Sequence, residues 1–203
     1  MGRRPVLSTD LDQFATIAAS HISTHNDTCC HTARLALTSA LDTGTVETSL
    51  AAVPAVVKWQ AVPWPASWCQ LVGDDDDEFI GDCGVHAALA ALILLQHGVA
   101  FERAQIAIAA DPYHVEHWRE RWRRAGIPQT WIGQHTVYHE VLAIGSRFLD
   151  PSEARWFTGP EATLPSGRVA ACRTSGGVWV TTPSDDMLRS VDCGYDGGTD
   201  ADH

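Results

Sequence analysis

Positive charge is scarce in this chain of 203 residues, where 14 lysines and arginines stand against 25 aspartates and glutamates for a net charge of -11. Proteins that follow nucleic-acid phosphates or bind anionic membranes carry the opposite excess. The shortage therefore excludes nucleic acid and acidic lipid as general partners. The negative charge is concentrated in residues 74–78 and in the tail from Asp185 onward, so the rest of the chain is nearly neutral.

Long hydrophobic segments are also missing. The longest largely apolar run, Val85–Leu95, is about half of the ~20 residues that a membrane-spanning helix needs. The first residues, MGRRPVLSTDLDQF, have two arginines with no apolar stretch behind them, unlike a secretory signal. The sequence thus predicts a cytoplasmic protein without a membrane segment. Its six cysteines are then expected to be free thiols rather than a disulfide framework.

The chain contains no internal repeat, and 45% of its residues are hydrophobic, which is typical of a globular protein. Its length fits one hydrophobic core better than two. We predict a single domain over residues 1–183. The remaining residues, 184–203, are rich in glycine and aspartate and are expected to form an acidic disordered tail.

Local patterns predict helices first and strands later. Helical patterns cover Thr9–His21 and Thr28–Leu41, which are expected to pack together as an N-terminal layer. The proline-containing segment Val53–Leu71 favours extended structure. The apolar segment Cys83–His97, rich in alanine and leucine and stopped by Gly98, is typical of a central buried helix.

The second half of the chain alternates like strands around one further helix. The expected elements are a strand at 101–109, an amphipathic helix at Pro112–Ala125, strands at Trp131–Ile144 and Arg147–Asp150 that turn at Gly145-Ser146, and a hairpin of 167–173 with 177–182. This order of helices, a central helix and mostly antiparallel strands indicates an α+β fold.

Cys83 is the residue most suggestive of chemistry, because it opens the expected buried helix in the sequence GDCGVHAALAALILLQHGV. The free N–H groups and partial positive charge of a helix N-terminus stabilise a thiolate and lower the pKa of a cysteine there. A cysteine that only fills space in the core is the alternative. The position at a capped helix start, where Gly84 keeps the space in front of the cysteine open, favours a nucleophile.

A nucleophilic thiolate is paired with an imidazole, which a third group orients. In the sequence HTVYHEVLAIGSRFLDPS, His139 and Asp150 lie on opposite arms of the expected hairpin. A turn at Gly145-Ser146 makes them near-diagonal neighbours on one face. His135 has the same strand parity but lies farther from Asp150. The hairpin therefore predicts His139 as the base, with His135 as the alternative.

These elements resemble the core of the transglutaminase-like cysteine enzymes of the papain-like superfamily. The resemblance covers roughly residues 80–152 and rests on Cys83, Ala87, Ala88, Leu89, Leu92, Gly98 and Val99 in the first element and on His139 through Ser152 in the second. It implies a papain/transglutaminase-like core, in which a central Cys-bearing helix packs on an antiparallel sheet, with N-terminal helices beside it. The chain order Cys, His, Asp is also that of the family.

The sequence departs from these relatives at specific positions. Transglutaminase-like cores place more residues between His and Asp than the eleven steps from His139 to Asp150, and the fifteen steps from His135 match their interval better. The resemblance thus favours His135 where the hairpin favours His139. The residues around Cys83 also resemble the bacteriocin-leader peptidases of the same superfamily, but the Gln that these carry six positions before the Cys is Asp77 here.

Acyl transfer also needs hydrogen-bond donors for the developing oxyanion, and one such donor is worth about 3 kcal/mol. The backbone N–H of Cys83 is one candidate. Gln70 is expected to supply the second, with Gln60 or a tryptophan N–H from residues 59–68 as alternatives.

The sequence gives a weaker signal for a metal site than for a catalytic cysteine. Cys29-Cys30-His31 with His25, and the pair His114 and His117, lack a second pair of ligands at a zinc-finger spacing. We therefore expect no metal site and no other cofactor.

The predicted function is acyl transfer through a thioester acyl-enzyme, with Cys83 as nucleophile, His139 as acid and base, and Asp150 as the orienting group. The donor is expected to be a peptide, an amide or a carrier-protein thioester, and the acceptor an amine, as in acyltransferases and transglutaminases. A cysteine peptidase or amidase uses the same triad, and an inactive binding module on the same scaffold is a further alternative.

A basic helix is the one other candidate interaction site. The sequence PYHVEHWRERWRRAG carries Arg119, Arg121, Arg123 and Arg124 beside an apolar stripe of Val115, Trp118 and Trp122. A half-buried surface helix explains this pattern. The functional alternative is a docking face for a carrier protein or peptide.

Overall fold

The computed structural model describes residues 22–23, 27–62, 66–73, 78–109, 112–125, 136–158, 163–164, 167–174 and 177–180. The expected helix Thr9–His21, the alternative base His135 and the expected tail 184–203 lie outside these residues. The structure therefore leaves the proposed division into a domain and a tail as a prediction.

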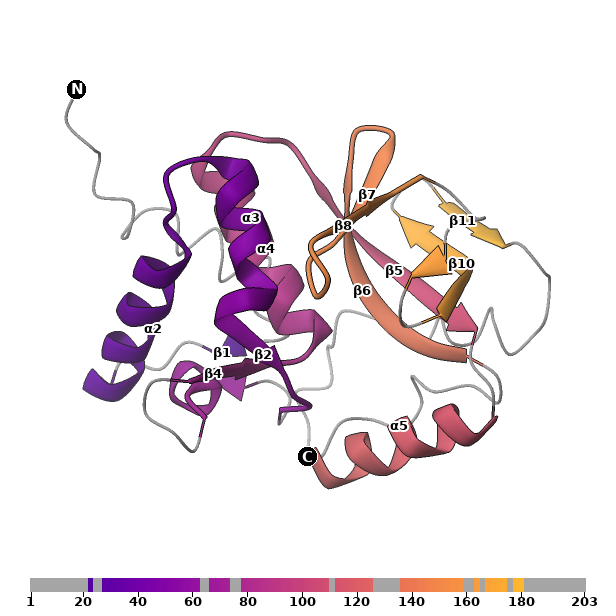
Figure 1. The fold of residues 1–203 in the computed structure, drawn as a ribbon, viewed down its shortest axis with the longest axis horizontal. Coiled ribbons are helices and arrows are strands. Elements are labelled where there is room, and N and C mark those ends of the chain that lie inside the picture. Colours follow the sequence, from indigo (N-terminus) through magenta and orange to yellow (C-terminus); the bar gives the residue numbers. More distant parts are fainter. Residues whose placement is uncertain are drawn as a thin grey trace, which may run out of the picture.

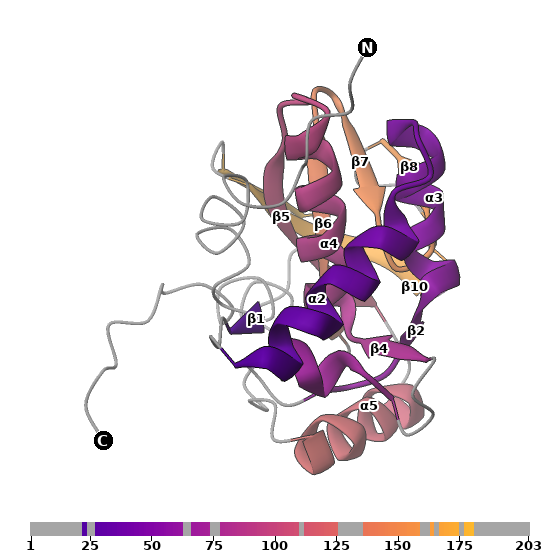
Figure 2. The same cartoon turned by 90° about the vertical axis from the view of Figure 1, so that its left-hand side faces the viewer.

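Helices and an antiparallel sheet form two sides of the molecule, so the fold is α+β as expected (Figure 1). The helices are α2 (Thr28–Leu41), α3 (Val46–Val56), α4 (Cys83–Gln96) and α5 (Pro112–Ala125), with a short 3-10 helix, η1 (Trp68–Leu71). Viewed from the helical side, α2 lies in front of α4, and the strands of the sheet lie behind (Figure 2).

The large sheet has seven strands, in the order β11-β10-β5-β6-β7-β8 with β9 paired to β10. Its strands are β5 (Glu102–Ala109), β6 (Thr136–Ile144), β7 (Arg147–Asp150), β8 (Arg155–Phe157), β9 (Thr163–Leu164), β10 (Gly167–Thr174) and β11 (Gly177–Val180). All of its strand pairs are antiparallel. The strands expected from sequence alternation are thus confirmed over the residues that the structure describes.

Two small parallel pairs lie beside the helices. They join β1 (Ile22–Ser23) to β3 (Ala66–Ser67), and β2 (Val57–Trp59) to β4 (Phe79–Gly81). The second pair is reinforced by an ion pair between Lys58 and Glu78. It brings the chain that precedes Cys83 against the end of α3.

Helices α2 and α4 have the predicted extents because their ends are encoded locally. The side chain of Asp27 caps the start of α2, and that of Asp82 caps the start of α4. At the end of α4, Gly98 has a φ of +67°, and the N–H of Val99 donates to the carbonyl of Leu94. Every residue of α4 from Cys83 to Leu94 is buried, as its apolar sequence predicts.

The expectation of extended structure over Val53–Leu71 is wrong at both ends. Helix α3 runs on to Val56 with Pro54 inside it, and the other end forms η1. Thr45 and Thr48 form a reciprocal capping box at the start of α3, and Val53 is fully buried against α4 and its neighbours. Capping and burial therefore outweigh the hydrogen bond that proline removes.

A close backbone approach fixes the junction between β4 and α4. A Cβ on Gly81 would lie 2.5 Å from a methyl carbon of Val85, so only glycine fits at this position. The carbonyl of Gly81 accepts a hydrogen bond from the N–H of Gln60, at 2.9 Å. These two contacts fix the backbone between β4 and α4, and they therefore set the position of Cys83.

Two apolar clusters lie among the residues that the structure describes. The larger one joins α2, α3 and α4 to Leu142 and Leu149 of the sheet. The smaller one lies within the sheet and includes Ile106, Val141 and Phe157. Among the described residues, no helix is long and apolar enough to cross a membrane.

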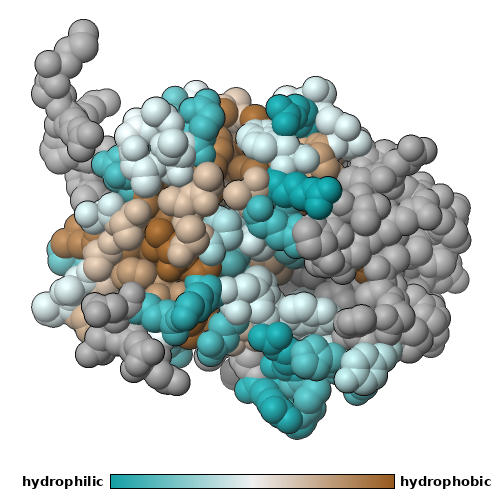
Figure 3. All heavy atoms as spheres, viewed as in Figure 1, coloured by the Kyte–Doolittle hydropathy of each residue, from teal (hydrophilic) through white to brown (hydrophobic). Residues whose placement is uncertain are grey.

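Helix α5 is a half-buried surface helix, as its amphipathic pattern predicts. Val115 and Trp122 are buried, and the ring of Trp118 packs edge-on against Trp59 at 4.6 Å between centroids. The guanidinium of Arg121 lies over the same two rings. On the face seen in Figure 3, the surface over α5 is hydrophilic, whereas hydrophobic residues gather over the helices at the left of the view.

Candidate active site

The structure places Cys83 as the first residue of α4, immediately after the capping residue Asp82. Oδ1 of Asp82 accepts the N–H of Val85 at 3.0 Å. The thiol of Cys83 is hydrogen-bonded to the side chain of His139 and to the backbone of Glu140, both in β6. The nucleophile candidate and the base candidate are therefore in direct contact, although 56 positions separate them in the sequence.

His139 and Asp150 face each other across the hairpin of β6 and β7. The observed pairs Ile144 with Arg147 and Leu142 with Leu149 are those of a two-residue turn at Gly145-Ser146, as predicted. Nε2 of His139 lies 2.9 Å from Oδ2 of Asp150. Because Nε2 faces the carboxylate, Nδ1 is the ring nitrogen left for the Cys83 thiol.

The three residues are shielded from water. Cys83 is 6% exposed, His139 is 9% exposed and Asp150 is fully buried. Burial lowers the pKa of His139, but the close negative charge of Asp150, together with Cys83, outweighs it and holds this pKa well above its usual value. The buried carboxylate of Asp150 therefore favours the protonated form of the His139 ring.

The pKa of the Cys83 thiol differs from the sequence-based expectation. Burial raises this pKa, and the hydrogen bond and charge of His139 oppose the rise without reversing it. A helix N-terminus was expected to lower it, but in this closed arrangement the loss of hydration dominates. The thiolate is favoured only when His139 is charged, so the two groups act as one coupled pair.

A second histidine, His86, lies one turn further along α4 and was not singled out from the sequence. Its Nε2 is 3.0 Å from the carbonyl of Val57, and its Nδ1 is 3.0 Å from Oγ of Ser152. Because a carbonyl only accepts, Nε2 carries the proton, and Nδ1 accepts from the Ser152 hydroxyl. Burial lowers the pKa of His86 to about 4, so its ring is neutral.

Ser152 links this neutral histidine to the acidic residue of the triad. Its backbone N–H donates to Oδ1 of Asp150 at 2.9 Å, and its hydroxyl contacts His86. Oδ1 of Asp150 is thus held by Ser152, while Oδ2 faces His139. The sequence Asp-Pro-Ser is typical of an aspartate that accepts the N–H two residues on, so this part of the site was detectable from the sequence.

Gln70 lies on the surface, in η1. Its Oε1 accepts the backbone N–H of Ser67 at 2.7 Å and the Ser67 hydroxyl at 3.1 Å. These contacts cap η1 and are not directed to Cys83. A role for Gln70 in an oxyanion site stays a prediction, and the backbone of Glu140 is the backbone group that contacts the Cys83 sulfur.

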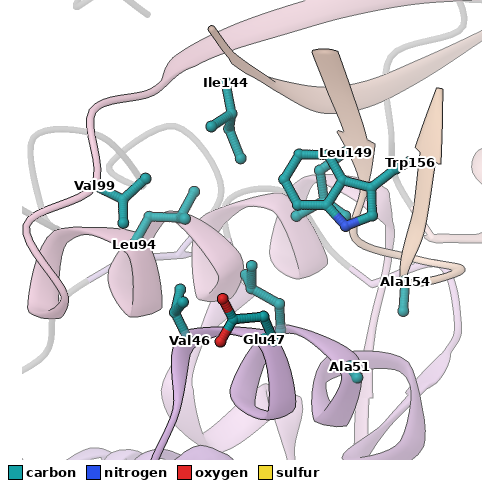
Figure 4. Close-up of a pocket in the computed structure, with 10 residues that line it drawn as sticks. Val46, Glu47, Ala51, Leu94, Val99, Ile144, Leu149, Ala154 and Trp156 are labelled. Carbon is teal, nitrogen blue, oxygen red and sulfur yellow. The ribbon is translucent and has the colours of Figure 1, made fainter. Parts of the chain in front are cut away.

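A pocket of about 310 Å³ lies elsewhere on the molecule. It is lined by residues of α3, the end of α4, the β6–β7 hairpin and β8, with Leu94, Leu149 and Trp156 turned toward it (Figure 4). Leu94 is eleven residues from Cys83 along α4, which corresponds to roughly 16 Å of helix. The pocket is therefore distant from Cys83 along α4, although Leu149, which precedes Asp150 in β7, lines it.

Comparisons with protein-family models, curated proteins and solved structures gave no match to this chain. What the site can do therefore follows from its own geometry. A thiol in contact with an imidazole that a buried carboxylate orients is suited to nucleophilic attack on a carbonyl carbon. Cys29, Cys30, Cys69 and Cys83 carry free thiols, as expected.

Proposed function

We propose that this protein is a cysteine-nucleophile acyl-transfer enzyme with a papain/transglutaminase-like core. The observation that carries the proposal is the continuous contact from Cys83 to His139 to Asp150. Helix α4 supplies Cys83, strand β6 supplies His139 and strand β7 supplies Asp150, so the chain order is Cys, His, Asp. A buried carboxylate would be a costly group to keep in a core without such a partner.

In the proposed reaction, Nδ1 of His139 takes the proton of the Cys83 thiol as the sulfur attacks the carbonyl carbon of the donor. The tetrahedral intermediate collapses, and the imidazolium of His139 gives its proton to the leaving amine or thiol. The product of this half-reaction is a thioester between the acyl group and Cys83. An acceptor amine then loses its proton to His139, attacks the thioester and regenerates the thiol.

Asp150 has two roles in this scheme. It fixes the ring so that Nδ1 faces the sulfur, and its negative charge stabilises the imidazolium that accompanies the thiolate. The N–H groups of Cys83 and Glu140 are the proposed donors to the developing oxyanion. Ser152 and His86 hold the carboxylate of Asp150 in place and do not contact the reacting atoms in this scheme.

Transfer to an amine is supported over hydrolysis by the shielding of the site. Cys83 and His139 are each less than one-tenth exposed, so little water has access to a thioester formed there. The donor class stays open between a peptide, an amide and a carrier-protein thioester. A peptidase or amidase differs from this proposal only in using water as the acceptor.

Docking of a carrier protein or peptide at α5 has weaker support. Arg119 pairs with Glu116, and both Arg123 and Arg124 pair with Glu120. Three of the four arginines are thus paired within the helix, by two glutamates, and the fourth, Arg121, packs on Trp59 and Trp118. We retain α5 as the proposed docking face and a cytoplasmic location as the proposed setting.

A test of the activity is to trap the acyl-enzyme. The full-length protein is incubated with a panel of acyl thioesters, activated esters and glutamine-containing peptides, and its intact mass is measured after rapid acid quenching. We expect a mass increase equal to one acyl group, on the peptide that contains Cys83, and release of this group by an added amine. Cys83→Ser and His139→Gln serve as inactive variants, and Cys193→Ser, in the expected acidic tail, is the matched control.

An inactive binding module is the second candidate, and one observation favours it. Cys83 is buried, and burial raises its pKa, so the thiol in this arrangement is both protonated and poorly accessible. The module predicts no acyl-enzyme with any donor of the panel. It also predicts that Cys83→Ser retains every binding property of the unmodified protein.

A further inference from the structure

Three cysteines and one aspartate meet at the start of α2, away from the candidate triad. Asp27 caps α2, Cys29 and Cys30 lie in its first turn, and Cys69 lies in η1. Sγ of Cys69 is 3.1 Å from Sγ of Cys30 and 3.9 Å from Oδ1 of Asp27, and it also hydrogen-bonds to Cys29. Cys69 is thus central to a cluster that joins two segments.

The distances in this cluster suit ligands of one tetrahedral ion. Ligand atoms of Asp27, Cys29 and Cys69 all lie within 4.8 Å of one another. Two thiolates bound to one Zn²⁺ at about 2.3 Å are about 3.8 Å apart. Cys30 stands outside this group, although its sulfur lies 3.1 Å from that of Cys69, so its side chain would have to move to join the other three on one ion.

A single disulfide accounts for less of the cluster. It would use two of the three thiols, for example Cys30 and Cys69, and leave out Cys29, whereas Asp27 caps α2 in either case. The carboxylate of Asp27 lies 3.9 Å from the sulfur of Cys69, and its negative charge would be balanced by a bound cation but not by a disulfide.

We propose that Asp27, Cys29, Cys30 and Cys69 form a structural site for a thiophilic divalent cation of the Zn²⁺ class. Four protein ligands complete a tetrahedral shell and leave no position for a substrate. The N-terminus of α2 adds a partial positive charge that stabilises the thiolates. The proposal does not depend on the activity assigned to Cys83.

The ion would fasten η1 to α2. From η1 the chain continues to β4 and then directly to Cys83, so the site would fix one end of the segment that leads to the nucleophile. The sequence alone did not reveal it, because Cys69 is 39 positions from Cys30. Only the fold brings the third thiol to the adjacent pair.

The test is a cobalt titration of the full-length protein, reduced and freed of metal in oxygen-free buffer. We expect one equivalent of Co²⁺ to bind with the visible bands of tetrahedral cobalt and with thiolate-to-cobalt charge transfer in the near ultraviolet, and Zn²⁺ to displace it. The melting temperature is expected to rise with the concentration of free Zn²⁺.

Variants locate the site. Cys29→Ser changes an exposed side chain and should fold normally while binding at least about tenfold more weakly. Cys69→Ser should abolish the thiolate bands, and Asp27→Asn, which preserves the helix cap, should weaken binding. The controls are Cys83→Ser, a buried thiol outside the cluster, and the double variant Cys172→Ser with Cys193→Ser, and both should bind as the unmodified protein does.

Three results would overturn the proposal. The first is the absence of tetrahedral thiolate bands. The second is Co²⁺ binding that is unchanged in Cys29→Ser and Cys69→Ser, or that is lost in the control variants. Either outcome would place the metal elsewhere. The third is a Cys30 to Cys69 disulfide in peptide maps of protein isolated without oxygen, because this would identify the pair as a redox couple.

Discussion

Nε2 of His139 lies 2.9 Å from Oδ2 of Asp150, and the Asp150 side chain is fully buried. The carboxylate is therefore poorly screened by water, and its effect on the imidazole is stronger than that of a surface carboxylate. This pair holds the pKa of His139 well above its usual value despite burial, which lowers it. The charged imidazole in turn stabilises the thiolate of Cys83.

Asp150→Asn should reduce acyl transfer by a factor of about 10² to 10⁴, because the ring loses both its orientation and the charge that stabilises the imidazolium. The variant keeps the size of the side chain. Its effect can be measured without a known substrate, as the rate of Cys83 alkylation against pH. We expect the profile to move to higher pH, whereas an unchanged profile would remove Asp150 from the proposed triad.

Acid should destabilise the protein through His86. Its pKa falls from 6.5 to about 4 on burial, so below about pH 6.5 the unfolded chain binds a proton that the folded chain does not. The free energy of unfolding is then expected to decrease as the pH falls from 6.5 to 4, by on the order of 3 kcal/mol. Urea unfolding measured at several pH values across this range should show that the free energy of unfolding changes less steeply with pH for His86→Gln than for the unmodified protein. Equal pH dependences would refute this assignment.

Alkali should destabilise the protein through His139, with the opposite sign. The folded pKa of this residue lies well above 6.5, so its contribution is complete below about pH 6.5 and is lost as the pH rises through the folded value. Unfolding measured above pH 6.5 should therefore show a decline that His139→Gln abolishes. If His86→Gln abolished the alkaline decline and His139→Gln did not, the two assignments would be reversed.

Gly81→Ala should destabilise the fold by about 1–3 kcal/mol, because the new Cβ would lie 2.5 Å from Val85. The double variant Gly81→Ala with Val85→Ala removes the clash at the cost of a cavity, so its loss should be smaller than the sum of the two single losses. Chemical unfolding of the four proteins measures this coupling. Additive losses would show that Gly81 is not held by Val85.

Much of the fold was predictable because its signals are local. The cap at Asp82 and the stop at Gly98 define α4, and the turn at Gly145-Ser146 defines the register that joins His139 to Asp150. These features depend on a few adjacent residues, so the sequence displays them directly. The choice of Cys83, His139 and Asp150 followed from the same signals.

The features that were missed depend on contacts between distant segments. Helix α3 contains Pro54 and is stabilised by burial of Val53 against other helices, which no local pattern encodes. His86 was hidden in an apolar run, and its partners Val57 and Ser152 come from two other parts of the chain. The raised pKa of Cys83 likewise reflects burial by the assembled fold rather than its place on the helix.

Competition among the thiols for a limiting amount of iodoacetamide tests the central claim most directly. The labelling is carried out at about pH 6, where an ordinary thiol, with a pKa of about 8.5, is almost entirely protonated, and the modified peptides are quantified by mass spectrometry. We predict that Cys83 is alkylated ahead of the exposed Cys29, and that His139→Gln and Asp150→Asn remove this preference. Uniform labelling, or labelling of Cys29 ahead of Cys83, would contradict the account of Cys83 as an activated nucleophile.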